Sequence, residues 1–288
     1  MIKGKAVIKI FVLASGRSGT QYLSSLFQDN VKNCVSRHEP YPSMFGKPIY
    51  WYQEKKFDDI RRLFAIKQRR ISRCRADVYL ETNNAFLKSF SDIAMEFFPD
   101  LKLIHIIRNP LEVARSQLNR HIWLNKIRLP LRRYYRGDDG KKYFRWTLTG
   151  KEDIFQSVTL DALTPYQYLV LQWIEIENRA IRFLDTYNKH SECYTLMAPG
   201  DLNNGEVIGN LFRFFGLERK DGRINFRGKK NGNKIPTVVS EEDLRQFRQV
   251  IGSLPDSCLR IFRNAPYTGC EWAKLLVENA GVAGQESE

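Results

Sequence analysis

The chain has 288 residues, of which 43% are hydrophobic and 12% aromatic, and its 46 Lys and Arg outweigh 32 Asp and Glu to give a formal net charge of +14. An apolar fraction of this size supports a continuous core, which excludes a disordered protein and a small disulfide-stapled scaffold. Five cysteines without a CxxC pair exclude a zinc ribbon and indicate a reducing compartment.

The positive charge is concentrated in three segments. Residues 55–75 carry nine basic and two acidic side chains, residues 126–145 carry eight and two, and residues 219–234 carry seven and one. A protein that is basic in patches commonly has an anionic partner, such as nucleic acid, an acidic membrane, a phosphorylated cofactor or an acidic polymer. Each cluster could equally be the solvated face of a helix.

The N-terminal apolar run spans about seven residues, which is too short for a membrane-spanning helix, and it lacks a signal-peptide cleavage pattern. We therefore expect a soluble, cytoplasmic protein without a transmembrane segment. No internal repeat or Pro/Gly/Ser-rich linker divides the sequence. A single domain over residues 1–288 is the prediction.

Strands and helices are predicted to alternate along the chain. Apolar runs predict strands over residues 6–14, 78–81, 101–107 and 193–197, and helical spacing predicts helices over 20–28, 85–98, 111–118, 166–187 and 206–215. A capping-box pattern at Ser240 predicts another helix over 244–251. Residues 120–160 lack a clear period and are interpreted as an insertion. This order indicates an α/β fold with a mainly parallel sheet and a site at the carboxyl ends of its strands.

The turn between the first predicted strand and helix combines glycines, hydroxyls and an arginine in the sequence SGRSGT. A helix N-terminus with such a turn favours a phosphate. A Walker A loop would need a lysine after Gly19, where Thr20 stands, and Arg108 follows the strand at which P-loop enzymes place a metal-binding acid. The pattern therefore predicts a nucleotide with separated anionic groups and no metal site.

Two motifs resemble those of the sulfotransferase superfamily. GRSGTQYL, residues 16–23, resembles its 5′-phosphosulfate loop, and IIRNPLEVARS, residues 106–116, resembles its 3′-phosphate motif. The resemblance implies a three-layer α/β/α fold of the P-loop-like sulfotransferase type. It also implies the donor 3′-phosphoadenosine 5′-phosphosulfate (PAPS), with the product 3′-phosphoadenosine 5′-phosphate (PAP). The implied donor-binding residues are Gly16, Arg17, Ser18, Gly19, Thr20, Gln21, Tyr22, Arg108 and Ser116, and a later basic loop resembling the family's Arg-Lys-Gly segment adds Arg227, Gly228 and Lys229.

The catalytic base is also implied by resemblance. His-Glu-Pro at residues 38–40 resembles a Gly-Glu-Pro whose glutamate deprotonates the acceptor, which assigns that role to Glu39 with His38 as the alternative. Arg17 would stabilise charge on the bridging oxygen. Other members use a histidine from a later segment, but neither His105 nor His121 falls in a comparable setting, and His105 is predicted to be a packed core residue.

The resemblance implies metal-independent, in-line transfer of a sulfuryl group to a hydroxyl or amine of a small-molecule, lipid or saccharide acceptor. Glu81-Thr82-Asn83 stands where some members have Asp-Lys-Thr, so the lysine of those members is not supplied there. Acceptor specificity is expected in the insertion, whose basic cluster at 126–145 points to an acidic acceptor or a membrane-surface substrate.

Two alternatives are a degenerate P-loop phosphotransferase of the kinase type and a basic nucleic-acid-binding protein. The second is suggested by the Arg/Tyr/Trp-rich residues 123–146. No nucleic-acid partner is expected for a sulfotransferase.

Overall fold

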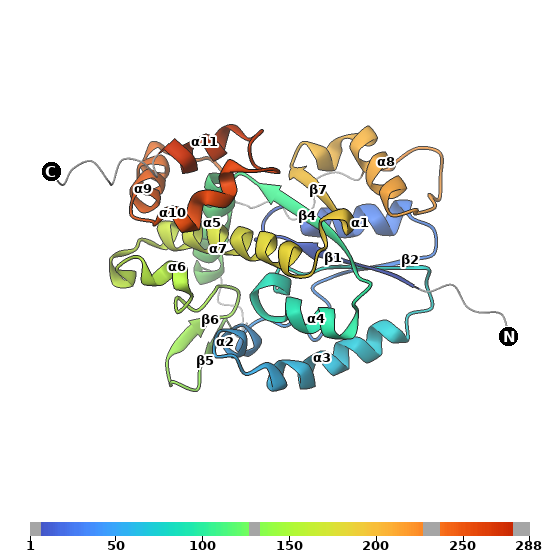
Figure 1. Ribbon diagram of the computed structural model, residues 1–288, viewed down its shortest axis with the longest axis horizontal. Helices are drawn as coiled ribbons and strands as arrows, with labels where there is room; N and C mark the ends of the chain where they lie inside the picture. The colour runs from blue at the N-terminus through green and yellow to red at the C-terminus, as the bar shows by residue number, and fades with distance from the viewer. Residues whose placement is uncertain (1–6, 127–132, 227–236, 279–288) are drawn as a thin grey trace.

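The structure is a computed structural model that describes residues 7–126, 133–226 and 237–278 (Figure 1). At its centre lies a sheet of five strands whose neighbours are all parallel, as the alternation of strands and helices predicts. The strands, in order across the sheet, are β2 (Cys34–His38), β3 (Val78–Thr82), β1 (Ile8–Leu13), β4 (Lys102–Arg108) and β7 (Cys193–Ala198).

Helices cover both faces of the sheet and make three layers (Figure 1). One face packs on α1 (Thr20–Asn30) and α8 (Gly205–Phe214). The core of the opposite face is built with α3 (Phe57–Ser72), η1 (Phe86–Phe90), α4 (Ser91–Phe97), α5 (Pro110–Lys126), α7 (Pro165–Thr186) and α9 (Glu241–Gly252). The remaining helices are α2 (Lys47–Gln53), α6 (Asp153–Gln156), α10 (Asp256–Leu259) and α11 (Glu271–Glu278), with short 3-10 turns over 160–162, 190–192, 201–203 and 260–263.

The central strands β1 and β4 are mostly apolar because both of their faces are buried. In β1, Ile10 and Val12 join the core under α1 and α8, whereas Phe11 and Leu13 join the core on the other side. Successive side chains of a strand point to opposite faces, so a strand between two helical layers needs a nearly continuous apolar run. That run is the pattern that predicted β1 and β4.

The helix predicted over 85–98 is instead two elements, a π-helical turn η1 followed by α4. All five side chains of η1 are buried, including Lys88 and Ser89. A helix with one solvent-facing side cannot bury five consecutive residues, so this segment is enclosed on all sides, and the helical character predicted for it is confirmed.

The region predicted as an irregular insertion contains regular elements. Helix α5 continues to Lys126, and β5 (Tyr134–Arg136) pairs antiparallel with β6 (Lys142–Phe144). The edge strand β2 was not predicted at all. The capping box at Ser240 is confirmed, because the Ser240 hydroxyl accepts from the Asp243 amide and the Asp243 carboxylate accepts from the Ser240 amide.

Two further expectations concern the core and membrane. His105 is 1% exposed and its Nε2 lies 2.9 Å from Glu177 Oε2, so it is a packed core residue, as predicted. Within the three described segments, no helix combines the length and apolar character that crossing a bilayer requires. The five cysteines are free.

Candidate functional site

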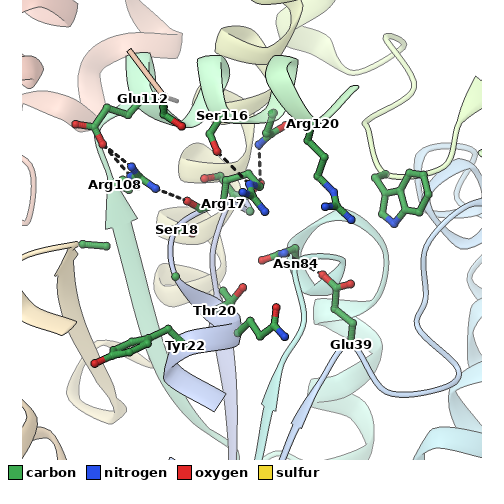
Figure 2. A pocket seen from close by; sticks show the side chains of 18 of the residues that line it. Arg17, Ser18, Thr20, Tyr22, Glu39, Asn84, Arg108, Glu112, Ser116 and Arg120 are labelled. Carbon is green, nitrogen blue, oxygen red and sulfur yellow. Dashed lines mark hydrogen bonds and ion pairs between the residues drawn. The ribbon is translucent and has the colours of Figure 1, made fainter. Parts of the chain in front are cut away.

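The carboxyl ends of all five parallel strands border one cavity of about 640 Å³. Parallel strands end at the same edge of a sheet, which is where α/β proteins bind ligands. This cavity is lined by the loop after β1, Glu39 after β2, Asn84 after β3 and Arg108 at the end of β4 (Figure 2). Pro199 after β7 also lines it. Its volume suits a ligand of nucleotide size.

The loop between β1 and α1 is held in an unusual backbone conformation. Gly16 and Gly19 have φ angles of 97° and 95°, a region that glycine enters without a steric cost. A Cβ on Gly19 would lie 2.5 Å from Leu202 Cδ1, so this glycine is also required by a close contact. The N-cap residue of α1 is Gly19, which has no side chain to cap the first turn, and a helix N-terminus of this kind suits an anion.

The two predicted nucleotide-binding motifs meet at this loop. Arg17 Nε donates to Ser116 Oγ over 3.1 Å, and Arg108 Nη1 donates to the Arg17 carbonyl over 2.8 Å (Figure 2). Glu112, one turn after Arg108, accepts from Nε and Nη2 of that arginine at 2.9 and 2.7 Å. The Arg108 guanidinium is therefore oriented by a carboxylate and a carbonyl at the rim of the cavity.

The loop end of the cavity has a positive potential. Burial, followed by repulsion from Arg120 and Arg108, lowers the pKa of Arg17 to about 10, while Glu39 opposes the shift. Three guanidinium groups thus lie near one cavity, and the charged form of Arg17 is destabilised there. Such a site favours an anionic ligand.

Several polar atoms that line the cavity are buried without a hydrogen-bond partner among the described residues. They are Ser15 Oγ, Ser18 Oγ, Gln21 Oε1, Tyr22 Oη and Asn84 Oδ1. Most buried polar atoms in proteins are hydrogen-bonded. Their concentration along one loop and its neighbour indicates that a ligand with many acceptor and donor atoms completes this site.

Glu39 lies across the cavity from the loop. Its Oε1 accepts from Asn84 Nδ2 at 3.0 Å, and its backbone has a φ of 48° (Figure 2). The neighbouring His38 has its Nδ1 3.0 Å from both the carbonyl and the hydroxyl oxygen of Thr82, and its Nε2 3.8 Å from Glu39 Oε1. Both candidate bases therefore line the cavity, and the His38 ring is fixed against β3.

A buried ion pair supports the segment that carries Glu39. Lys67 Nζ, on α3, donates to Glu81 Oε1 at 2.6 Å and to the Pro40 carbonyl at 3.3 Å. Glu81 also accepts from the Tyr79 hydroxyl and the Asn83 amide. Glu81 is thus the centre of a core network that links α3, β3 and the residue after Glu39.

Three cavity residues were missed or set aside by sequence reasoning. Lys88 is 3% exposed, donates from Nζ to the Trp146 carbonyl at 2.8 Å, and has a pKa that burial lowers to about 8 although Glu39 opposes the shift. Arg120 and His121 lie near the end of α5 and also line the cavity. His121 was judged to lie outside a catalytic setting; the structure puts it on the cavity wall. Burial, followed by Lys88 and Arg120, lowers its pKa to about 4.

Other predicted features lie elsewhere. Arg227, Gly228 and Lys229 fall outside the described residues. The basic cluster at 55–75 includes α3, where Arg61 pairs with Asp58 and Glu96 on the solvent side. Among the residues that the structure describes, no group of three His, Cys, Asp or Glu side chains could hold a metal ion.

Comparison with known proteins gives structural neighbours only. No protein-family model matches the chain, and no curated protein matches it in sequence. A sulfotransferase from Alicyclobacillus acidocaldarius is 16% identical, with a TM-score of 0.48 over 88% of this chain and 96% of that one. A sulfotransferase domain from the curacin biosynthetic pathway is 12% identical, with a TM-score of 0.36 over 85% and 98%. One from the Synechococcus PCC 7002 olefin synthase is 12% identical, with a TM-score of 0.40 over 86% and 96%. Because the identities and TM-scores are this low, the neighbours carry no argument about function, and the function is inferred from the residues of the cavity.

Proposed function

We propose that this protein is a sulfotransferase that transfers a sulfuryl group from PAPS to the hydroxyl of an acceptor. The observation that carries the proposal is the meeting of two distant motifs, in which Arg17 contacts Ser116 and Arg108 contacts Arg17 beside the same cavity. The donor has a 5′-phosphosulfate and a 3′-phosphate, and the two motifs offer cations and hydroxyls for two separated anionic groups.

The residues present fit this donor. The uncapped first turn of α1 and the hydroxyl of Ser18 would hold the 5′ group, and Arg108 with Ser116 would hold the 3′-phosphate. Gly16, Gly19, Thr20 and Gln21 complete the loop, and Tyr22 lines the cavity from the first turn of the helix. The buried polar atoms without partners along this loop are the sites that such a ligand would satisfy.

The donor supplies the sulfuryl group, whose bond to the bridging phosphate oxygen breaks as a bond to the acceptor oxygen forms. Glu39 would accept the acceptor's hydroxyl proton, because its carboxylate lines the cavity and is held by Asn84. Arg17 would stabilise the negative charge that develops on the bridging oxygen. Lys88, which interacts electrostatically with Glu39, would supply a further positive charge to that region.

The decisive experiment is a thermal-shift titration with PAP, with and without Mg²⁺, against ATP and a short oligonucleotide. A ligand present at about 100 times its Kd stabilises the folded state by roughly 2.7 kcal/mol, which is readily seen as a higher Tm. We expect PAP to stabilise the protein equally with and without Mg²⁺. Stabilisation only by ATP with Mg²⁺ would favour the kinase-type alternative, and salt-sensitive stabilisation by the oligonucleotide would favour the nucleic-acid alternative.

A further inference from the structure

Part of the cavity that Glu39 lines has a different chemical character from the loop. Its described lining includes Phe45, His121, Leu124, Phe144 and Trp146, which we call the aromatic wall. None of these residues belongs to the two nucleotide-binding motifs. They come from the loop before α2, the last turns of α5, and β6 with the residues that follow it.

The aromatic wall is continuous. The rings of His121 and Phe144 have centroids 4.4 Å apart, and those of Phe144 and Trp146 are 5.3 Å apart, both at steep interplanar angles. The lowered pKa of His121 leaves its ring uncharged at neutral pH, because burial and the neighbouring Lys88 and Arg120 disfavour the cation. The wall therefore offers ring faces and edges, with the Arg145 guanidinium over the Trp146 ring 5.8 Å from its centroid, and such a surface suits another flat ring.

Hydrogen bonds to its backbone, from main-chain and side-chain partners, hold the segment that carries Phe144 and Trp146 to the rest of the fold. The Gly46 amide donates to the Arg145 carbonyl at 3.0 Å, and Lys88 Nζ donates to the Trp146 carbonyl at 2.8 Å. The next apolar residue, Leu148, donates its amide to Gln172 on α7 at 2.8 Å. The segment from β6 onward is thus positioned by three separate elements, and a ligand would meet a surface that is already formed.

The basic cluster at 126–145 does not supply cations to this cavity from its described residues. The cations among the described lining residues are Arg17, Lys88, Arg108 and Arg120. Arg136, Lys141 and Lys142 on the hairpin are exposed. The described residues of the hairpin present Phe144 to the cavity, whereas most of their charge faces solvent and the Arg145 guanidinium lies over the Trp146 ring. The acidic acceptor expected from the sequence stays a prediction.

We propose that the aromatic wall is the acceptor subsite and that the acceptor is a small phenol, whose ring packs on Phe144 and Trp146 while its hydroxyl faces Glu39. This inference rests on the proposed function for the identity of the reaction. The binding of a flat apolar ring depends only on the wall. Lys88 lies between the two, since its Nζ contacts the Trp146 carbonyl and its charge interacts with Glu39.

The test measures binding and turnover separately in the full chain. Calorimetric titration of 2-naphthol into the protein saturated with PAP gives the affinity for a phenol without any reaction. The two test variants are Phe144→Ala and Trp146→Ala, both at half-buried side chains. Each should weaken naphthol binding roughly tenfold or more, because the free energy of an aromatic contact together with that of burying its apolar area exceeds about 1.4 kcal/mol. PAP affinity should stay within about twofold, because neither residue belongs to the donor motifs.

A matched control is Ile122→Ala, which alters an exposed apolar side chain on α5 next to His121 and outside the cavity lining. It should leave naphthol and PAP affinities unchanged. Turnover with PAPS is then compared for 2-naphthol, an acidic tyrosine peptide and N-acetylglucosamine. We expect the highest kcat/KM with the free phenol.

Each result has a distinct meaning. Unchanged naphthol affinity in both alanine variants would overturn the subsite, and so would a higher kcat/KM for the sugar or the peptide. The protein could also fail to bind PAP and still bind naphthol in a way that depends on Phe144. That result would overturn the sulfotransferase proposal but not the aromatic subsite.

Discussion

The Arg17 guanidinium donates from Nε to Ser116 Oγ over 3.1 Å, although 99 residues separate the two in the chain. The contact joins the loop after β1 to helix α5, which follows β4. β1 and β4 are paired neighbours in the sheet, so their carboxyl ends bring the two motifs together. The proposed donor site therefore follows from strand order, and residues at the two motifs can be tested for separate roles.

The role of Arg108 is testable with ligands that differ in one phosphate. Arg108→Ala should weaken PAP binding roughly 10- to 100-fold, because a charge-assisted hydrogen bond contributes about 1.5–3 kcal/mol. Adenosine 5′-phosphate, which lacks the 3′-phosphate, should bind the variant and the wild type about equally. Isothermal titration calorimetry provides both affinities.

A control variant and a second ligand test whether Arg108 acts on the 3′-phosphate. Arg136→Ala, at an exposed arginine on β5, should leave both affinities unchanged. An equal loss for PAP and adenosine 5′-phosphate in Arg108→Ala would mean that the Arg108 contact with the Arg17 carbonyl shapes the loop, and that the 3′-phosphate assignment is wrong.

Glu39 is the proposed base, and Glu39→Gln removes its proton-accepting capacity while keeping an oxygen that Asn84 can donate to. Turnover should fall roughly 10²- to 10⁴-fold, the usual contribution of a positioned general base. PAP affinity should change little. Steady-state kinetics together with PAP titration separates the two effects.

The matched variant is His38→Gln, which alters the alternative base on the adjacent residue. We expect a smaller loss, since the His38 ring is held by Thr82 at the end of β3. A larger loss in His38→Gln than in Glu39→Gln would transfer the assignment to His38.

The charge of Lys88 should be visible in the pH dependence of turnover. Burial lowers the pKa of Lys88 to about 8, so its ammonium group is charged below that pH and neutral above it. If this charge assists transfer, kcat should decline as pH rises through about 8. Lys88→Arg keeps the charge and should not show this decline, whereas Lys88→Met should give a low rate at every pH.

The same pH series includes a readout for a purely structural role. Lys88 donates to the Trp146 carbonyl, so its loss could loosen the aromatic wall. In that case naphthol affinity would fall in Lys88→Met and the wild-type pH profile of kcat would match that of Lys88→Arg. Matching pH profiles of kcat in the wild type and Lys88→Arg would contradict the proposal that the Lys88 charge assists transfer.

The sequence predicted the parts of the site that are encoded locally. The glycines and hydroxyls around Arg17 are contiguous, and Arg108 ends a strand whose burial on both faces makes it mostly apolar. Both motifs can be read without knowing the fold. Their contact with one another needed only the assumption of a parallel sheet.

Lys88 and His121 were not predicted because their positions depend on tertiary structure. Lys88 lies in a π-helical turn inside an apolar stretch that predicts an ordinary amphipathic helix. His121 belongs to the part of α5 that continues past the predicted end at 118. The edge strand β2 has alternating polar residues and only five positions, which gave too little apolar pattern to detect.

The last prediction concerns the buried pair of Lys67 and Glu81, whose side chains are 2% and 0% exposed. Lys67→Met would leave the Glu81 carboxylate buried without its cation and should lower the free energy of unfolding by about 3–5 kcal/mol. Because Lys67 also donates to the Pro40 carbonyl, turnover should fall as the adjacent Glu39 loses its support. The double variant Lys67→Met with Glu81→Gln should recover much of the stability, since no uncompensated charge remains.

The exposed pair of Lys56 and Asp138 is the control for that experiment, with side chains 42% and 43% exposed. Lys56→Met should change the free energy of unfolding by at most about 1 kcal/mol, because solvent screens a surface ion pair. Urea unfolding of the four proteins gives the comparison. A double variant that recovers stability but not turnover would mean that Lys67 positions Glu39 through Pro40, whereas recovery of both would assign the whole effect to the buried charge. A Lys67→Met protein as stable as the wild type would contradict the role of the pair in the core.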